Sequence, residues 1–370
     1  MSGVTRRTWE DGAGLHLGMV SPILLAEFKD HLHPGSWREG LPRGQGGTPA
    51  NLLCRELLAR GQRLTIFTLD PAVRDEVVLD GPRLRICVGP YGGPPGRRPA
   101  RDFFTPERAW LVRTIQREAP DVLHAQWTYL HALAAQASGV PHLITSHDAP
   151  LQVLRHEFIP YRIAHTLMAW RVLSRARRVV SVSPYVARHL RRWMGYRGPL
   201  EVIPNGMPQA LFEPRPARRR QGPGVAYASV LSGWTRLKNG EVALRAFSEV
   251  RRRRPDDELL LVGPDQGPGG LAESWARRHG LVEGVRFVGP RPHPEVLRLL
   301  AEEVDVMVHP SLEEACPMVV LEASALGLPV VGGDRSGGVP WTLDEGRAGV
   351  LTDVRSPAAV ARAMHALAGA

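Results

Sequence analysis

The sequence lacks any run of the roughly 18 to 20 uncharged apolar residues that a membrane-spanning helix needs. Its first residues, MSGVTRRTWEDGAG, are polar where the core of a signal peptide would be apolar. Cysteine is scarce, and Cys54, Cys87 and Cys316 are odd in number and far apart, which argues against a disulfide framework and a closed metal site. We therefore expect a cytoplasmic protein with reduced, packed cysteines.

Lysine is almost absent, because only two of the 47 lysine and arginine residues are lysines, Lys29 and Lys238. Arginine therefore carries almost all of the positive charge behind the net charge of +10. The places where these arginines cluster indicate what kind of partner the charge could bind. The arginine clusters at 218–220 and 251–254 lack the interleaved aromatic residues of a single-strand binder. Solvated helix ends or a linker explain these clusters better than nucleic acid does, and no nucleic-acid partner is expected.

The arginine-rich stretch from 162 to 197 differs from those clusters. It carries Leu167, Trp170 and Trp193 among its arginines. Apolar side chains mixed with cations are typical of surfaces that bind anionic membranes. Peripheral membrane docking therefore stays open as a lesser alternative.

Short apolar runs alternate with longer helical patterns throughout the chain of 370 residues, and the rhythm occurs twice. This pattern predicts two α/β domains with parallel sheets covered by helices. We expect a first domain over 1–205, a Pro-, Gly- and Arg-rich linker over 206–222 and a second domain over 223–370. The predicted strands are Leu15–Val20, Arg63–Thr68, Leu84–Val88, Val122–His124, His142–Thr145 and Val179–Val182, then Val225–Val230, Leu259–Val262, Val285–Val288, Val304–His309 and Pro329–Val331. The predicted helices are Pro49–Arg60, Pro106–Glu118, Glu241–Arg252, Gly270–His279, His293–Glu302, Pro317–Leu326 and Pro357–Leu367.

The strongest motif is HPSLEEACPMVVLEASALGLPVV, over 309–331. A strand ends at its first residue, a loop carries Glu314, Pro317 opens a helix, and Glu322 lies in that helix. The free N–H groups of Met318 and Val319 at the helix start suit a diphosphate. Carboxylates accept hydroxyl protons, so Glu314 suits a sugar and Glu322 a ribose diol. On spacing alone, two carboxylates that only favour the helix dipole or face solvent explain the motif equally well.

This segment resembles the E-x7-E signature of the family 4 retaining glycosyltransferases of GT-B fold, with Glu314 and Glu322 at the two positions. Further matches follow in order along the chain: Gly46-Gly47-Thr48, DVLHAQW, TSHD, SVSPYVARHL, VIPNG, Lys238-Asn239, RFVGP and Gly337-Gly338. The resemblance implies two Rossmann-like domains facing a central cleft. It also implies transfer of a hexose-type sugar from a nucleotide diphosphate sugar without a metal ion.

Lys238 follows the first strand of the second domain, where an ammonium could neutralise the donor diphosphate. The resemblance gives it that role. The family places an arginine five residues earlier, where this chain has Gly233, and Arg236 is the candidate replacement. A solvated lysine at a helix start is the plainer interpretation.

His147 ends a predicted strand, and the resemblance places a histidine there beside the donor sugar or its phosphate. Gly47 lets the backbone approach the phosphates, although a plain turn would need the same residue. The resemblance extends the donor site to Cys316 and Pro290. We therefore predict Glu314, Lys238 and His147 as catalytic residues, and Glu322, Gly47, Arg236, Cys316, Met318, Val319 and Pro290 as donor-binding residues.

No cofactor is expected beyond the nucleotide diphosphate sugar as substrate, with a UDP-sugar favoured over a GDP-sugar. The acceptor is open among polysaccharide, lipid-linked and small-molecule classes, and 26–45 is the segment expected to contact it. A nucleotide-sugar epimerase of the same fold and a non-catalytic binding module are alternatives. A dinucleotide oxidoreductase is a weaker one, resting on a G-x-G-x-x-A match at Gly267, Gly269 and Ala272 that Pro268 interrupts.

Overall fold

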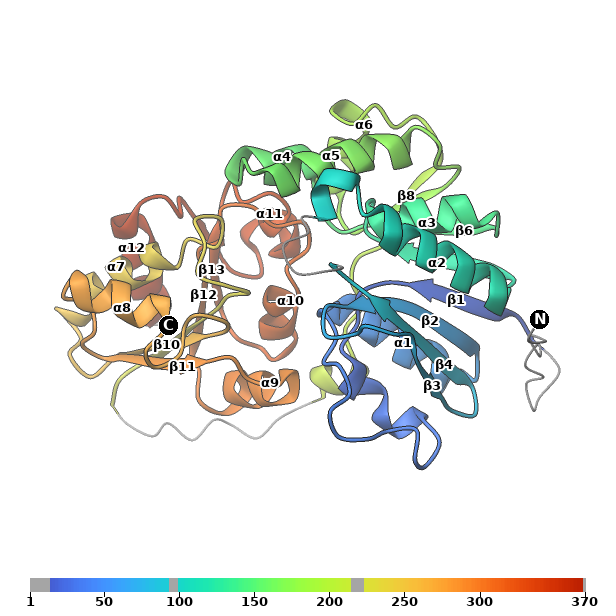
Figure 1. The fold of residues 1–370 in the computed structure, drawn as a ribbon. Helices are drawn as coiled ribbons and strands as arrows, with labels where there is room; N and C mark the ends of the chain where they lie inside the picture. The colour runs from blue at the N-terminus through green and yellow to red at the C-terminus, as the bar shows by residue number, and fades with distance from the viewer. Residues whose placement is uncertain (1–13, 93–98, 214–222, 369–370) are drawn as a thin grey trace. The chain divides into compact units, whose positions relative to one another are not determined.

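The computed structural model describes residues 14–92, 99–213 and 223–368 and divides into two compact units, Met1–Gly206 and Met207–Ala370 (Figure 1). The polar start of the chain and the arginines at 218–220 lie outside the described residues, as does most of the expected linker. The described part of that linker contains a short 3-10 helix, η3 (Gln209–Phe212).

The first unit is an eight-stranded sheet in the order β3-β4-β2-β1-β5-β6-β7-β8. All its pairs are parallel except β3 with β4, so the expectation of a wholly parallel sheet is wrong at this edge. Helices α2, α3, α5 and α6 cover one face and α1 the other, as right-handed crossovers require (Figure 1). The strands are β1 (His16–Val20), β2 (Arg63–Asp70), β3 (Val77–Asp80), β4 (Leu84–Pro90), β5 (Val122–Gln126), β6 (His142–Ser146), β7 (Val179–Ser181) and β8 (Leu200–Val202). The helices are η1 (Leu25–His31), α1 (Thr48–Ala59), η2 (Pro99–Asp102), α2 (Thr105–Glu118), α3 (Leu130–Ser138), α4 (Pro150–His156), α5 (Pro160–Leu173) and α6 (Pro184–Arg192).

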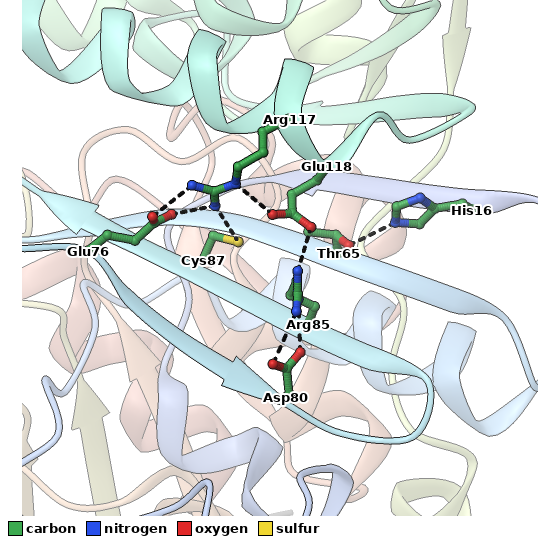
Figure 2. A network of polar contacts seen from close by, with 8 residues as sticks. All are labelled: His16, Thr65, Glu76, Asp80, Arg85, Cys87, Arg117 and Glu118. Carbon is green, nitrogen blue, oxygen red and sulfur yellow. Dashed lines mark hydrogen bonds and ion pairs between the residues drawn. The ribbon is translucent and has the colours of Figure 1, made fainter. Parts of the chain in front are cut away.

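A network of charged side chains joins the antiparallel edge β3–β4 to α2 (Figure 2). Arg85 donates to Asp80 at 2.8 Å and to Glu118 at 2.9 Å, and Arg117 donates to Glu118 at 2.9 Å and to Glu76 at 2.6 Å. The hydrogen bond to Asp80, reinforced by Glu118, raises the pKa of Arg85 above its usual range. Because Arg85 lies near the amino end of its strand, the network is at the edge of the sheet opposite to the one where ligands bind.

The second unit is a six-stranded, wholly parallel sheet in the order β11-β10-β9-β12-β13-β14. Its central strands are largely apolar because both of their faces are covered. Leu259 and Leu261 of β10 pack into the core with Tyr227, whereas Leu260 packs with Met307 on the other face. The strands are β9 (Ala226–Val230), β10 (Glu258–Val262), β11 (Val285–Gly289), β12 (Val306–His309), β13 (Val330–Gly333) and β14 (Val350–Thr352). The helices are α7 (Gly240–Arg251), α8 (Leu271–Arg278), α9 (His293–Glu302), α10 (Met318–Ala325), α11 (Val339–Thr342), η4 (Asp344–Gly346) and α12 (Pro357–Ala368).

The expected architecture of two α/β units built on parallel sheets is thus confirmed. Every predicted strand and helix is present, with ends displaced by at most two residues, and α9 has the predicted bounds. The predicted ranges omit the strands β3, β8 and β14 and the helices α3, α4, α5, α6 and α11. The three cysteines are buried, as expected.

Candidate functional site

The second sheet has its switch point between β9 and β12. From β9 the chain runs outward through β10 to β11, then returns to the other side of β9 and continues through β12 to β14. The loops after these two strands, 231–239 and 310–317, therefore leave the carboxyl edge of the sheet side by side. Open parallel sheets bind their ligands at such a point.

Hydrogen bonds fasten these two loops to each other. Asn239 has a left-handed backbone, with φ of 55°, and its side-chain amide donates to the carbonyl oxygen of Pro310 at 3.0 Å. The N–H of Leu312 donates to the carbonyl oxygen of Leu237 at 2.8 Å. The backbone on both sides of Lys238 is therefore held against the neighbouring loop.

Lys238 and Glu314 form an ion pair across these loops. The distance from Lys238 Nζ to Glu314 Oε1 is 2.6 Å, and the two side chains are 20% and 15% exposed. Burial alone would raise the pKa of Glu314, but the Lys238 ammonium and the nearby His309 outweigh it and hold this pKa well below its usual range. Glu314 is therefore a carboxylate at any physiological pH.

His309, the last residue of β12, lies under this pair. Its Nε2 is 3.4 Å from Glu314 Oε1, and its side chain is 3% exposed. Within the described part of the chain neither ring nitrogen has a partner with hydrogen-bond geometry. His309 can therefore still form a hydrogen bond when the groups around it rearrange.

Helix α10 begins at Met318, with Pro317 as its N-cap residue. The expectation that Pro317 is the first helical residue is thus off by one position. Its carbonyl oxygen accepts from the N–H groups of Val320 and Leu321, at 3.1 and 3.2 Å. The N–H groups of Met318 and Val319 precede this ladder and point out of the helix start, where an anion would be stabilised.

Glu322, one turn into α10, is buried and paired with His293. The distance between His293 Nε2 and Glu322 Oε1 is 2.7 Å, and the Glu322 side chain is 4% exposed. His293 is the first residue of α9, which follows β11 at the same edge of the sheet. The carboxylate is thus held in one orientation by a residue that the sequence did not single out.

The remaining predicted residues of this unit differ in exposure. Cys316 is buried in the loop before α10, and Pro290 is exposed directly after β11. Arg236 is exposed and forms no ion pair with any residue that the structure describes. Gly233 has φ of +155°, which an arginine would adopt only with strain. A phosphate-binding role for Arg236 stays a prediction.

In the first unit, Gly47 is the N-cap residue of α1, with φ of +100°. A Cβ atom at this position would lie 2.1 Å from the carbonyl oxygen of Pro22. The loop after β1 therefore requires glycine for close packing of its own backbone. This packing explains the residue without a ligand, and its predicted contact with phosphate stays a prediction.

His147 follows β6 and contacts two residues at the end of β5. Its Nε2 lies 2.5 Å from Gln126 Oε1, and its ring centroid is 4.6 Å from that of Trp127. Burial, with a smaller effect of His124, lowers the pKa of His147 to about 3. The imidazole is therefore neutral, and when Nε2 donates to Gln126 its Nδ1 is left as a hydrogen-bond acceptor.

A cavity of about 400 Å³ lies on the α1 face of the first sheet, next to His147. Most of its lining is apolar. Its polar part is formed by His124 and Thr145, whose Nε2 and Oγ1 atoms are 2.7 Å apart, with Gln126 and His147.

Sequence reasoning missed three residues of these sites, His293, His309 and Gln126. His309 and Gln126 end predicted or observed strands at the ligand-binding edge, so their positions were the available signal. No group of three or more His, Cys, Asp or Glu side chains suited to a metal ion occurs in the described ranges. None of the helices in those ranges is long and apolar enough to cross a bilayer.

The two units match two family models. Residues 50–210 match Glycosyltransferase Family 4, and residues 222–369 match Glycosyl transferases group 1. The division between these matches falls in the region where the two compact units meet along the chain.

Curated relatives are D-inositol 3-phosphate glycosyltransferases. The protein from Nocardia farcinica is 28% identical over 340 residues, which is 85% of this chain and 74% of that protein. The protein from Corynebacterium kroppenstedtii is 41% identical over 139 residues, which is 36% of this chain and 30% of that protein. The matches thus span less than half the length of the Corynebacterium relatives.

Solved structures share the fold. A sucrose-phosphate synthase from Thermosynechococcus elongatus superposes with a TM-score of 0.72 at 21% identity, covering 96% of this chain and 91% of the other. WaaG, a glycosyltransferase involved in lipopolysaccharide biosynthesis, superposes with a TM-score of 0.68 at 13% identity, covering 96% and 90%. Anabaena HepE in complex with UDP-glucose gives 0.65 at 18% identity, covering 95% and 89%.

At identities of 21% and 13%, the similarity to these structures establishes the fold alone, and that fold is GT-B. The family models add the family itself. This chain belongs to the family 4, or group 1, glycosyltransferases.

Proposed function

We propose that the chain moves a hexose-type sugar from a nucleotide diphosphate sugar to an acceptor hydroxyl. The observation that carries this proposal is the Lys238–Glu314 ion pair at the switch point of the second sheet, beside the start of α10. An ammonium and free helix N–H groups are a suitable environment for the charge that develops on a departing diphosphate. Family membership supports the reaction class.

In this proposal Glu314 binds the hydroxyls of the sugar. When the diphosphate binds beside Lys238, the ammonium is shared between phosphate and carboxylate. The bond between the anomeric carbon and the phosphate oxygen breaks, and the acceptor oxygen bonds to that carbon. The acceptor proton passes to the diphosphate on the same face, so the anomeric configuration is retained.

Glu322 is proposed to bind the ribose diol, with His293 fixing its orientation. His147 is proposed to accept a hydrogen bond from the donor, since a neutral imidazole cannot supply positive charge to phosphate. Gly47, Arg236, Cys316 and Pro290 remain proposed donor contacts together with the N–H groups of Met318 and Val319.

A UDP-sugar is the proposed donor, and the complexes of Anabaena HepE with UDP and with UDP-glucose support this choice. No metal ion is proposed, because Lys238 and the helix N–H groups supply the charge that a metal ion would otherwise give. A cytoplasmic location is proposed because three buried cysteines, odd in number and far apart in the sequence, suit a reducing compartment.

The direct test incubates the chain with radiolabelled UDP-sugars, excess EDTA and a panel of acceptors. The panel includes polysaccharide, lipid-linked and small polyol phosphates, the last because of the name that the curated relatives carry. Labelled product whose anomeric configuration equals that of the donor supports the proposal. Isomerised sugar without acceptor would indicate an epimerase, and UDP binding without turnover on any acceptor would indicate a binding module.

A further inference from the structure

Helix α5 of the first unit exposes an apolar stripe. Leu167 and Trp170 are 43% and 41% exposed, and Ile159, just before the helix, is 47% exposed. The opposite face of the helix, with Ala164, Met168 and Val172, is buried in the core. Single exposed apolar residues are common on protein surfaces, whereas a row along one helix face is a feature of binding surfaces.

Arginine surrounds this stripe. Residues 149–200 contain ten arginines and a single carboxylate, Glu157, so they hold nine of the ten net positive charges of the chain. Glu157 pairs with Arg162 at 2.7 Å. The other nine arginines form no ion pair with any described residue. Arg171 stands four positions after Leu167 on the same side of α5, and Arg175 lies in the turn that follows the end of this helix.

The next helix on this face of the sheet carries the same kinds of exposed side chain. Strands β6, β7 and β8 are neighbours in the sheet, so their right-handed crossovers place α5 and α6 side by side on one face (Figure 1). Trp193, directly after α6, is 55% exposed, and the guanidinium of Arg192 lies 5.3 Å from the centre of its ring. Arg188 is exposed on the same helix.

We propose that this α5–α6 surface, defined by Ile159, Leu167, Trp170, Arg171, Arg175, Arg188, Arg192 and Trp193, docks on an anionic lipid bilayer. Arginine heads attract anionic headgroups, while tryptophan and branched aliphatic side chains enter the boundary between headgroups and acyl chains. Nucleic acid fits less well, because isoleucine and leucine gain nothing from stacking on bases. The proposal goes beyond sugar transfer and is independent of it.

The experiment measures binding of the full chain to vesicles by sedimentation. One vesicle type is pure phosphatidylcholine, and the other contains about one third phosphatidylglycerol. We expect binding to the anionic vesicles, weakened by added salt because of screening, and little binding to the neutral ones. Absence of binding to anionic vesicles at low salt, or equal binding to both types, would overturn the proposal.

Two double variants locate the surface. Arg171→Ser with Arg175→Ser should weaken binding to anionic vesicles about 25-fold, since each cation near the membrane contributes a factor of about 5. Leu167→Ser with Trp170→Ser should weaken it about tenfold or more, by removing the inserted apolar groups. All four side chains are exposed, so thermal unfolding of both variants should match that of the parent chain.

The matched control is Arg252→Ser with Arg253→Ser at the end of α7, which removes two exposed charges from the second unit. This control should bind vesicles within about twofold of the parent chain. An equal loss in the control would show that total charge alone drives binding, and would overturn the assignment.

Tighter binding to single-stranded RNA than to vesicles at ~0.15 M salt, lost in the Arg171/Arg175 variant, would assign the surface to nucleic acid instead.

Discussion

Lys238 donates to Glu314 at 2.6 Å, although 76 positions separate them in the sequence. The sheet order brings them together, because β9 and β12 are neighbours and each residue lies in the loop after its strand. In the absence of a ligand the carboxylate neutralises the ammonium. A diphosphate that binds here must therefore compete with Glu314 for Lys238.

Replacing Lys238 by alanine should lower turnover about 100-fold or more, because a charge that stabilises the leaving diphosphate is lost. The measurement is steady-state kcat with the best donor and acceptor pair. Arg252→Ala is the control, since it removes an exposed cation at the C-cap of α7 and should leave kcat unchanged. Near-normal turnover of the Lys238 variant would remove this residue from the mechanism.

Glu314→Gln should abolish transfer yet leave UDP affinity unchanged or higher. The variant removes the carboxylate that competes with the diphosphate for Lys238, and it also removes a partner of the sugar hydroxyls. Glu322→Gln should instead weaken UDP binding, because a carboxylate is the better acceptor for two ribose hydroxyls. Calorimetric titration with UDP compares them, and an equal loss of affinity in both variants would contradict this division.

His293→Leu should destabilise the protein by about 1–3 kcal/mol, because it leaves the buried Glu322 carboxylate without its imidazole partner. UDP affinity should fall as well. A double-mutant cycle with Glu322→Gln should give a coupling free energy above about 0.5 kcal/mol in thermal or denaturant unfolding. Additive effects would mean that the contact between these two side chains is without energetic consequence.

The Arg85 network should contribute to stability and not to turnover, since it lies at the amino edge of the first sheet. Arg85→Leu leaves Asp80 and Glu118 without this partner and should cost about 2 kcal/mol of unfolding free energy, below the value for a fully buried pair. Arg60→Leu breaks an exposed pair with Glu56 and should cost about 0.5 kcal/mol or less. Lowered kcat in a folded Arg85 variant would contradict this assignment.

Acidification should destabilise the first unit. Burial is the main cause that lowers the pKa of five of its histidines to about 3 or 4: His124, His131, His147, His165 and His189. Between pH 6.5 and about 4 the unfolded chain binds protons that the folded chain does not, so stability falls as pH falls. Asp148 has the opposite effect on stability, because burial raises its pKa to about 6 and the folded chain binds this proton first. One aspartate offsets only part of the effect of the five histidines.

The variant that checks this pH dependence is His189→Leu, since His189 is buried and its Nε2 has no partner in the described structure. Over the same pH interval its stability curve should be shallower than that of the parent chain by about 1.4 kcal/mol per pH unit. Urea unfolding at several pH values measures both curves. Parallel curves would show that His189 takes up its proton in the folded state as readily as in the unfolded state.

The sequence predicted the central strands because both of their faces are covered, which makes them rich in apolar residues. The strands that it missed, β3, β8 and β14, are all edge strands. Val78 of β3 and Val202 of β8 are each 41% exposed, and β14 is only half-buried. Such strands are defined by pairing with one neighbour, which composition does not reveal.

Only part of the candidate site could be predicted from the sequence. The spacing of Glu314 and Glu322 drew attention to α10, and scarcity of lysine drew attention to Lys238. Their direct ion pair depends on strand order, and the His293–Glu322 contact depends on how α9 starts beside α10. Neither contact has a local sequence pattern, because each joins residues from separate strand–helix units.

The central claim is that the switch point of the second sheet binds a nucleotide diphosphate sugar, and a crystal structure of the full chain with UDP tests it most directly. We predict diphosphate oxygens within hydrogen-bond distance of Lys238 Nζ and of the N–H groups of Met318 and Val319, with the ribose at Glu322. Ordered UDP bound away from Lys238 and α10 would contradict the account.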